Sequence, residues 1–387
     1  MDSGKPLKIG IIGCGNIVKA GHKPALEALG DVEVVAMMDV TPARLKLGQE
    51  WFHLPDDALY TDYQSLIDRD DIDIVLVTVP QQFRKEMVTY ALEKGKHILS
   101  EKPVAITPAE AAAFSALAKQ NNLRFGMVHN YVYFPGYKLV KSLIEQGEIG
   151  DVRVITLNYL GVIDNPGVRE YQADWRHKLE AGGGVLMDMI HAVYLAEWLA
   201  GEKAIQVNAF ADAPTYGYRN PEIEDLILLQ VAFPSRYALI NMGWGQGVGG
   251  VDVSGTQGHL RMTNEKYQTS GFNRPAELYS VHDWVRTDHE IPNEPDYLAH
   301  LAASFTGIWR DFCDAVREGR DPVATVDDAQ RALEIALAGY LSGSTGRTIA
   351  LPFPTDHPVY LKGIHGIADI ASWENSKTRQ AGIFGLG

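Results

Sequence analysis

The stretch that decides the fold is LKIGIIGCGNIV, residues 7–18. Its apolar run predicts a buried strand, and the two glycines that follow predict a tight turn into a helix. Gly13 permits the turn, and Gly15 has no Cβ to keep a phosphate away from the backbone amides. Asn16 and Ile17 open the helix, whose N-terminus would face the anion. The pattern therefore predicts a dinucleotide-binding turn.

A carboxylate at the end of the second apolar run strengthens this prediction. Asp39 lies 24 positions after Gly15, where its oxygens can accept both ribose hydroxyls. The same charge would repel a 2′-phosphate, which favours NAD over NADP. Arg44, on the next helix, could still assist a phosphate, and an aspartate in a solvated turn is the alternative interpretation of Asp39.

Strands alternate with helices over the first third of the chain. The strand-like runs are apolar throughout, as is typical of strands buried on both faces of a parallel sheet. This pattern predicts a Rossmann domain over residues 1–127. The expected strands are 7–12, 32–39, 72–79, 97–100 and 123–128, and the expected helices are 24–29, 42–51, 83–94 and one opened by Thr107-Pro108.

The second part of the chain predicts a different architecture over residues 128–351. Its strands follow one another with few helices between them, which favours an open, mainly antiparallel sheet covered by helices on one face. The last segment, 352–387, shows no strong periodicity and is taken as an extension. The expected strands are 152–160, 204–211, 225–233 and 237–242, and the expected helices are 135–145, 184–199, 308–317 and 326–340.

Composition excludes several classes of partner. The 387-residue chain has a formal net charge of −14 and no run of Lys and Arg, so nucleic acid is not an expected partner. No window approaches the roughly 20 apolar residues that span a bilayer, and the N-terminus lacks the apolar core of a signal peptide. Two cysteines, Cys14 and Cys313, form no disulfide framework. These features predict a cytosolic enzyme without a membrane partner.

Two polar groups are candidates for catalysis. Lys102, in Glu101-Lys102-Pro103, follows the strand 97–100, and residues beyond the carboxyl ends of parallel strands face the ligand crevice. Asp188 and His191 follow the triplet Gly182-Gly183-Gly184 and stand three apart, so on one helix they would share a face. The alternatives are a lysine that faces solvent and a buried Asp–His hydrogen bond with a structural role.

These motifs, in this order, resemble those of the glucose–fructose oxidoreductase/inositol dehydrogenase (Gfo/Idh/MocA) family. The resemblance rests on the glycine turn, on Glu101-Lys102-Pro103 with Thr107-Pro108-Ala109-Glu110, and on Trp175-Arg176 with the glycine triplet, Asp188 and His191. It implies a Rossmann domain followed by a mainly antiparallel domain, with the active site between them. It also implies oxidation of a secondary hydroxyl of a sugar, a sugar derivative or a cyclitol.

The resemblance assigns roles to individual residues. Lys102 would bond to the reacting hydroxyl, His191 would exchange its proton, and Asp188 would bind a neighbouring hydroxyl or orient the histidine. Glu101 would place Lys102 and the nicotinamide riboside, and Pro103 would follow a cis peptide bond. Chemistry agrees, because hydride can leave carbon only as the hydroxyl loses its proton to a base. The sequence does not decide whether Lys102 or His191 is that base.

The chain also departs from the family pattern. Asp188 and His191 are three apart, whereas the family more often spaces this pair by four. Val79, Pro80, Gln81 and Arg84 stand where the family usually has Thr-Pro-Asn and a histidine, and Pro80 and Gln81 are the expected cofactor contacts there. Asn130, in a matching His129-Asn130-Tyr131, and Arg176 are expected on the substrate side.

We therefore expect an NAD-dependent dehydrogenase that acts on a small polyol or sugar, and no metal. One alternative is a glycoside-cleaving enzyme that recycles NAD through transient oxidation. Another is a non-catalytic dinucleotide sensor, although retention of Lys102 and His191 argues against it. An open sheet face that needs a cover predicts a homo-oligomer, a dimer or a tetramer.

Overall fold

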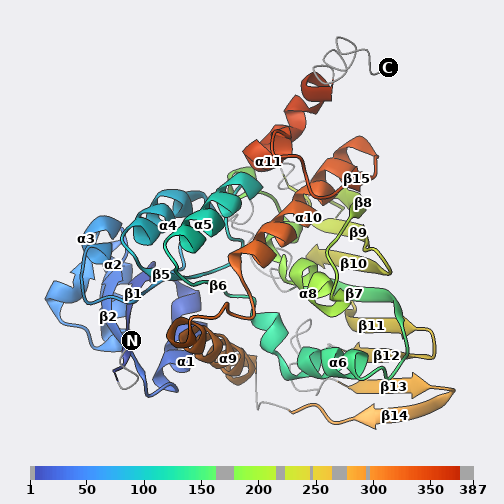
Figure 1. Ribbon diagram of the computed structural model, residues 1–387, viewed down its shortest axis with the longest axis horizontal. Helices are drawn as coiled ribbons and strands as arrows, with labels where there is room; N and C mark the ends of the chain where they lie inside the picture. The colour runs from blue at the N-terminus through green and yellow to red at the C-terminus, as the bar shows by residue number, and fades with distance from the viewer. Residues whose placement is uncertain are drawn as a thin grey trace.

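Two β-sheets with their covering helices lie side by side in the computed structural model (Figure 1). The N-terminal residues form one sheet and its helices, and most of the later residues form the second. The structure describes residues 5–162, 178–214, 223–244, 247–263, 277–292 and 297–374.

The first sheet has six strands in the order β3-β2-β1-β4-β5-β6, and every pair is parallel. This confirms the predicted Rossmann sheet; the short strand β3 was not expected. Its central strands are buried on both faces, which explains their continuous apolar runs. The strands are β1 (Leu7–Ile12), β2 (Val32–Met38), β3 (Leu59–Tyr60), β4 (Ile74–Val77), β5 (His97–Ser100) and β6 (Phe125–Met127).

Helices cover both faces of this sheet. One face packs against α3 (Tyr63–Ile67), α4 (Arg84–Glu93) and α5 (Pro108–Gln120), and the other against α1 (Lys23–Glu27) and α2 (Pro42–Phe52). The side chain of Thr107 caps α5 by accepting the Glu110 amide at 3.1 Å. This is the expected N-cap, which satisfies one of the helix's unpaired donors.

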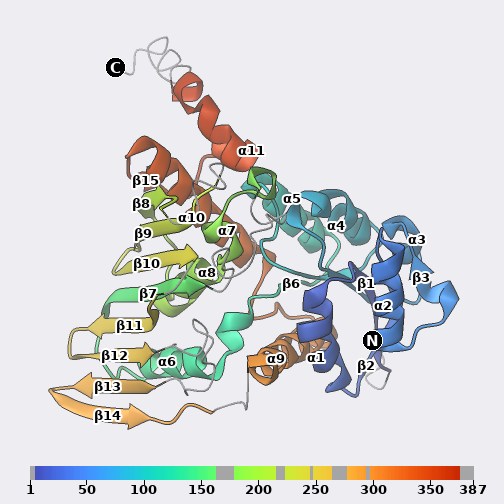
Figure 2. The same cartoon turned by 180° about the vertical axis from the view of Figure 1, so that it is seen from behind.

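The helix after the glycine turn begins with a π-helical turn, Val18–His22, that precedes α1. A long helix from late in the sequence, α9 (Tyr297–Glu318), packs against this turn. It begins well before the predicted 308–317, and its Phe305 and Trp309 are buried against the first sheet's helices. Residues from the C-terminal part of the chain thereby lie beside α1 (Figure 2).

The second sheet has nine strands in the order β14-β13-β12-β11-β7-β10-β9-β8-β15. All its strand pairs are antiparallel except β7 with β10, which confirms the predicted mainly antiparallel sheet. Sequence analysis missed the strands after residue 248. The strands are β7 (Val152–Val162), β8 (Gln206–Asp212), β9 (Leu226–Ala232), β10 (Tyr237–Trp244), β11 (Gly249–Gly255), β12 (Gly258–Thr263), β13 (Leu278–His282), β14 (Val285–His289) and β15 (Ile349–Ala350).

One face of this sheet is covered by helices and the other is open, as predicted. The helices α6 (Pro135–Glu145), α8 (His191–Ala200) and α10 (Val326–Thr345) lie on the covered face. Burial alternates strictly along β9 and at the start of β10, where Leu229 and Ile240 are buried while Leu228 and Leu239 are exposed. Alternation of this kind marks a half-buried strand.

The predicted helix 184–199 is wrong in one respect. It consists of two helices, α7 (Val185–Asp188) and α8, separated by Met189 and Ile190; the φ of −101° and ψ of 33° at Met189 are not helical. Asp188 therefore ends one helix and His191 begins the next, so the two do not share a helical face. Further along, α11 (Pro358–Lys362) and a 3₁₀ helix, Gly363–Asp369, form part of the C-terminal extension.

Close packing of α9 on the π-helical turn Val18–His22 leads to a testable prediction about Gly21. A Cβ at Gly21 would lie 2.8 Å from the Phe305 ring. We expect Gly21→Ala to lower the free energy of unfolding by about 1–3 kcal/mol, because the buried ring has little room to move. Gly30→Ala is the matched control, because a Cβ there meets nothing within 4 Å. Urea unfolding would measure both, and equal stability of the two variants would contradict the packing.

Candidate active site

A cavity of about 270 Å³ lies between the glycine turn of the first sheet and the helix pair α7–α8. It brings together side chains from both halves of the molecule. Seven of the predicted site residues line it: Ile17, Pro80, Glu101, Lys102, Asn130, Asp188 and His191.

The glycine turn has the geometry that a dinucleotide needs. Gly13 has a φ of 100°, and a Cβ on it would meet the Thr78 hydroxyl at 2.6 Å. A Cβ on Gly15 would meet nothing within 4 Å, so its backbone faces open space. Asn16 is exposed beside it. These residues fit a bound pyrophosphate, whose oxygens would approach the amides of the turn.

Asp39 stands beside this turn, at the end of β2. Its Oδ2 accepts the Cys14 amide and its Oδ1 accepts the Thr41 amide, each at 2.8 Å. The alternative of a solvated turn aspartate is wrong, because Asp39 is 6% exposed. Each carboxylate oxygen has a second lone pair that can accept a ribose hydroxyl. Arg44 is exposed on α2.

Arg84 holds together the loops after β4 and β5. Its Nε donates to the Val79 carbonyl at 2.8 Å, and its Nη1 donates to the carbonyls of Glu101 and Pro103. Burial lowers the pKa of Arg84 to about 10, so it still carries its charge at neutral pH. Gln81 is buried one turn away, near Gly182. The arginine that replaces the family's histidine therefore fixes the loop that carries Lys102.

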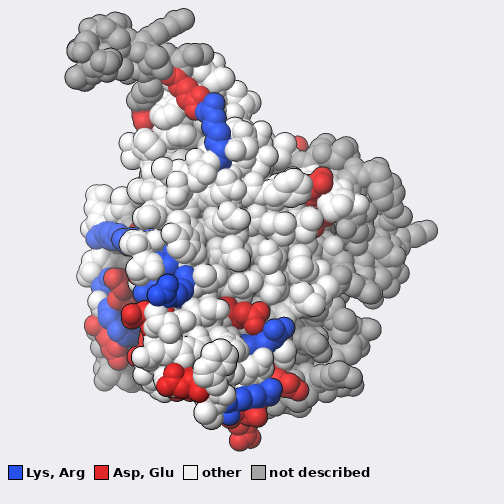
Figure 3. Space-filling model, turned by 90° about the vertical axis from the view of Figure 1, so that its right-hand side faces the viewer, with Lys and Arg blue, Asp and Glu red and all other residues white. Residues whose placement is uncertain are grey.

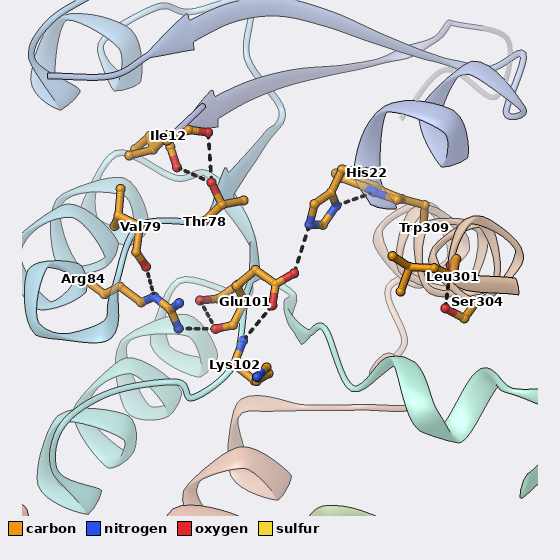
Figure 4. A network of polar contacts seen from close by, with 12 residues as sticks. Ile12, His22, Thr78, Val79, Arg84, Glu101, Lys102, Leu301, Ser304 and Trp309 are labelled. Atoms are coloured by element: carbon orange, nitrogen blue, oxygen red, sulfur yellow. Dashed lines mark hydrogen bonds and ion pairs between the residues drawn. The ribbon is translucent and has the colours of Figure 1, made fainter. Parts of the chain in front are cut away.

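Glu101 is held from the opposite side by His22 and Trp309 (Figure 4). The Trp309 indole donates to His22 Nδ1 at 3.0 Å, and His22 Nε2 lies 3.3 Å from Glu101 Oε1. Because an indole N–H can only donate, His22 carries its proton on Nε2 and donates to the carboxylate. The other oxygen of Glu101 accepts the Lys102 amide at 3.2 Å. His22 thus holds the Glu101 carboxylate in the position from which it accepts the Lys102 amide.

Lys102 connects the two halves of the site. The peptide bond between Lys102 and Pro103 is cis, as the resemblance implied. Lys102 Nζ donates to the Asp188 carbonyl oxygen at 2.5 Å and lies 4.0 Å from Asp188 Oδ1. The other carboxylate oxygen of Asp188 accepts the Trp244 indole at 3.4 Å. Asp188 therefore orients the lysine, whereas Nδ1 of His191 lies next to the Tyr194 hydroxyl and not next to Asp188.

His191 is held by aromatic side chains. Its Nδ1 lies 2.7 Å from the Tyr194 hydroxyl, and the Tyr131 ring stacks on its imidazole with centroids 4.4 Å apart. Burial lowers the pKa of His191 well below its ordinary value, and the charges of Lys102 and His129 lower it further. The imidazole is therefore neutral at physiological pH.

Of the other residues expected on the substrate side, the structure describes Asn130 but not Arg176. Asn130 is 5% exposed and lines the cavity at the start of a 3₁₀ turn, Asn130–Tyr133. Arg176 and Trp175 lie outside the residues that the structure describes.

The glycine triplet lets α7 approach the rest of the second domain. A Cβ at Gly183 would lie 2.1 Å from the Tyr340 hydroxyl, and one at Gly184 would lie 2.1 Å from the Glu224 carbonyl. The Glu224 carboxylate accepts the amides of Gly184 and Leu186 at 3.0 and 2.9 Å, and the Tyr340 hydroxyl at 2.9 Å. Glu224 thereby caps the short helix that ends in Asp188.

Two family models match the chain. The Gfo/Idh/MocA model described as an oxidoreductase family with an NAD-binding Rossmann fold matches residues 7–129. The model of the same family's C-terminal alpha/beta domain matches residues 141–351, more than half of the chain.

The chain belongs to the Gfo/Idh/MocA oxidoreductase family.

Members of this family with assigned activities are similar to the chain at low identity. A dTDP-3,4-didehydro-2,6-dideoxy-alpha-D-glucose 3-reductase from Saccharopolyspora spinosa is 32% identical over 185 residues, 48% of this chain, and the chain spans about half (53%) of that relative. The scyllo-inositol 2-dehydrogenase (NADP(+)) IolW of Bacillus subtilis (strain 168) is 23% identical over 89% of the chain and 96% of its own length. A levoglucosan dehydrogenase in complex with NADH has a TM-score of 0.77 at 22% identity, covering 90% of this chain and 100% of that one.

Two features are absent from the described residues of this Gfo/Idh/MocA oxidoreductase. Among them, no group of three or more His, Cys, Asp or Glu side chains is arranged to hold a metal ion. None of the helices in the described part of the chain combines the length and the hydropathy needed to cross a membrane.

Sequence analysis missed four residues that organise the site. Arg84 was noticed as a departure from the family, but its clamp on three carbonyls has no sequence signal. No sequence pattern points to His22, which the structure places 3.3 Å from the Glu101 carboxylate. Tyr194 and Glu224 act through contacts that the fold creates, so single-sequence patterns could not reveal them.

Burial of Glu224 makes a pH-dependent prediction. It raises the pKa of this carboxyl group from 4.5 to about 7. Between these two pH values the folded chain keeps a proton on Glu224 that the unfolded chain has released. The contribution of Glu224 to stability is therefore greatest below pH 4.5 and falls as pH rises through about 7. We expect a loss on the order of 1–3 kcal/mol between pH 5 and 7.5 relative to Glu224→Gln.

Urea unfolding at a series of pH values would measure this difference. The quantity to compare is the pH slope, because the glutamine amide also perturbs the cap at every pH. Glu93→Gln, at an exposed carboxylate on α4, is the control and should leave the slope unchanged. A parallel pair of curves for the wild type and Glu224→Gln would refute the role of the buried proton.

Proposed function

We propose that the protein is an NAD-dependent dehydrogenase that oxidises a secondary hydroxyl of a sugar, a sugar derivative or a cyclitol. The observation that supports this most directly is that Lys102 and His191 line one cavity beside the glycine turn. The turn would place a nicotinamide cofactor at the same cavity. Relatives named as sugar or cyclitol oxidoreductases are consistent with this substrate class.

Residues of the first sheet would hold the cofactor. Gly13, Gly15, Asn16 and Ile17 would bind the pyrophosphate, and the buried carboxylate of Asp39 would accept the ribose hydroxyls and disfavour a 2′-phosphate. The loops at Pro80, Gln81 and Glu101 would surround the nicotinamide. When bound, the oxidised nicotinamide supplies the hydride acceptor.

Residues from both halves of the cavity would hold the substrate. A polyol presents adjacent hydroxyl groups that both donate and accept hydrogen bonds. Lys102 and His191 would contact the reacting oxygen, and the Asp188 carboxylate and the Asn130 amide would bind neighbouring hydroxyls. Arg176 is proposed as a further contact. A site of this kind suits a neutral polyhydroxylated ring, because its charged groups include both signs.

Self-association is a second element of the proposal. Apolar side chains are exposed together on the open face of the second sheet: Phe210, Leu228, Tyr237 and Leu239. Figure 3 shows this side of the molecule, where a broad area without charged side chains is bordered by Lys, Arg, Asp and Glu. Burial of such a patch is favourable, so we propose that it packs against a second copy of the chain.

Assays with a panel of monosaccharides, glycosides and inositols, each with NAD and with NADP, test the function. We expect reduced-cofactor absorbance to rise with NAD and at least one polyol, and Lys102→Met to lose about 100-fold or more of that rate. Asp39→Asn should move the NAD preference toward NADP at least tenfold, since it removes the repelling charge. Sugar release without net NADH would instead indicate the glycoside-cleaving alternative. Binding of NAD without any turnover would favour the sensor.

Light scattering tests the proposed oligomer. The wild type should give a particle of at least twice the 42.7 kDa chain mass. The double variant Leu228→Glu/Tyr237→Glu should dissociate, because it places buried charges in the interface. Leu361→Glu, at an exposed apolar residue of α11, is the control and should not dissociate. A wild-type monomer would rule the interface out.

A further inference from the structure

We propose that Tyr194 fixes neutral His191 as the tautomer with its proton on Nε2, so that His191 donates a hydrogen bond to the reacting oxygen and Lys102 alone exchanges the proton. This inference rests on the dehydrogenase function proposed above. It assigns separate roles to the two groups, which the sequence left undivided.

The hydrogen-bond partners of Tyr194 determine where its phenol proton goes. Its hydroxyl oxygen accepts the Tyr131 backbone amide at 3.3 Å and lies 2.7 Å from His191 Nδ1. A backbone amide can only donate, so it cannot receive the phenol proton. Among the described residues, His191 Nδ1 is the acceptor that remains for this proton.

The opposite arrangement leaves a donor without an acceptor. If His191 Nδ1 carried the proton and donated to Tyr194, the phenol O–H would have no acceptor in the described part of the chain. Tyr194 is 4% exposed, and its ring is covered on one side by the His129 ring, stacked with centroids 3.8 Å apart. A buried donor without a partner is unfavourable, so the phenol donates to Nδ1.

The second step concerns the other ring nitrogen. Once Nδ1 accepts the phenol proton, a neutral imidazole must carry its hydrogen on Nε2. His191 lines the cavity, and its Nε2 has no hydrogen-bond partner among the described residues. The Nε2–H group is therefore available to a substrate oxygen, and its nitrogen has no lone pair with which to act as a base.

Protonation of His191 offers no alternative route. Burial and the neighbouring Lys102 hold the pKa of the imidazole far below its ordinary value, so an imidazolium is disfavoured. A neutral imidazole that donates from Nε2 to a polarised oxygen is an established type of electrophile. The group left to exchange the proton is Lys102, held in place by the Asp188 carbonyl.

The proposed step balances as follows. In oxidation, the substrate O–H bond breaks and an N–H bond forms on the unprotonated Lys102 amine. A bound oxidised nicotinamide would supply the acceptor for the electron pair and hydrogen of the breaking C–H bond, so that the substrate becomes a carbonyl compound. Throughout, His191 keeps its Nε2 proton and stabilises the developing negative charge on oxygen. Reduction reverses these steps, with the Lys102 ammonium supplying the proton.

Nitrogen-15 NMR of the protein labelled at histidine tests the tautomer without any turnover. The two ring signals of His191 are those missing from the spectrum of His191→Gln. We expect one protonated nitrogen, Nε2, and one unprotonated nitrogen, Nδ1, at neutral pH. In Tyr194→Phe the Nδ1 signal should move toward that of an unprotonated nitrogen without a hydrogen bond. A protonated Nδ1 in the wild type, or an Nδ1 signal unmoved in Tyr194→Phe, would overturn the proposal.

Kinetics of two variants test the division of roles. A glutamine at position 191 can place an amide N–H near the position of Nε2, whereas a leucine cannot. We expect His191→Gln to keep at least a tenth of kcat and His191→Leu to lose about 100- to 1,000-fold, as for loss of one oxyanion donor. Equal losses would show that His191 is the base. If the substrate panel finds no turnover, the proposed function fails, yet the NMR result still decides the tautomer.

Discussion

The hydrogen bond between Lys102 Nζ and the Asp188 carbonyl oxygen, 2.5 Å long, joins the two halves of the site. Lys102 comes from the carboxyl edge of the first sheet, and Asp188 ends a helix of the second domain. Neither sheet alone could position the lysine, because its backbone is fixed by Glu101 and Arg84 while its ammonium is fixed from across the cavity. The position of the Lys102 ammonium therefore depends on how the two sheets pack together.

This dependence explains why so much of the second domain supports one short helix. The helix α7 has four residues, too few to be stable alone. The carboxylate of Glu224 holds its N-terminal amides, and Gly183 and Gly184 let Tyr340 and the backbone of Glu224 approach within distances that any side chain would block. The position of Asp188, and through it that of Lys102, follows from these buried contacts.

The sequence predicts the first sheet well because its strands are buried on both faces and interrupted by strong turn signals. The same reasoning misses β11–β14, whose alternating residues pair with neighbours that a local pattern does not reveal. It also joins α7 and α8 into one helix, since the apolar run 184–199 continues across the break at Met189. At the cavity, residue types identified Lys102, Asp188 and His191. The residues that hold these three side chains in place were not predictable. Arg84 and His22 contact segments that are far from them in the sequence, and Tyr194 acts through the position of its hydroxyl group beside His191.

Burial decides which polar group of the site can carry a charge. The side chain of Lys102 is 19% exposed and lies near the Asp188 carboxylate, so water and a negative charge both stabilise an ammonium there. His191 is 9% exposed, stacked under Tyr131 and close to a cation, so an imidazolium there would be opposed by both desolvation and charge. The proposed division of roles, in which the lysine exchanges the proton and the histidine stays a fixed dipole, rests on this difference in burial and charge.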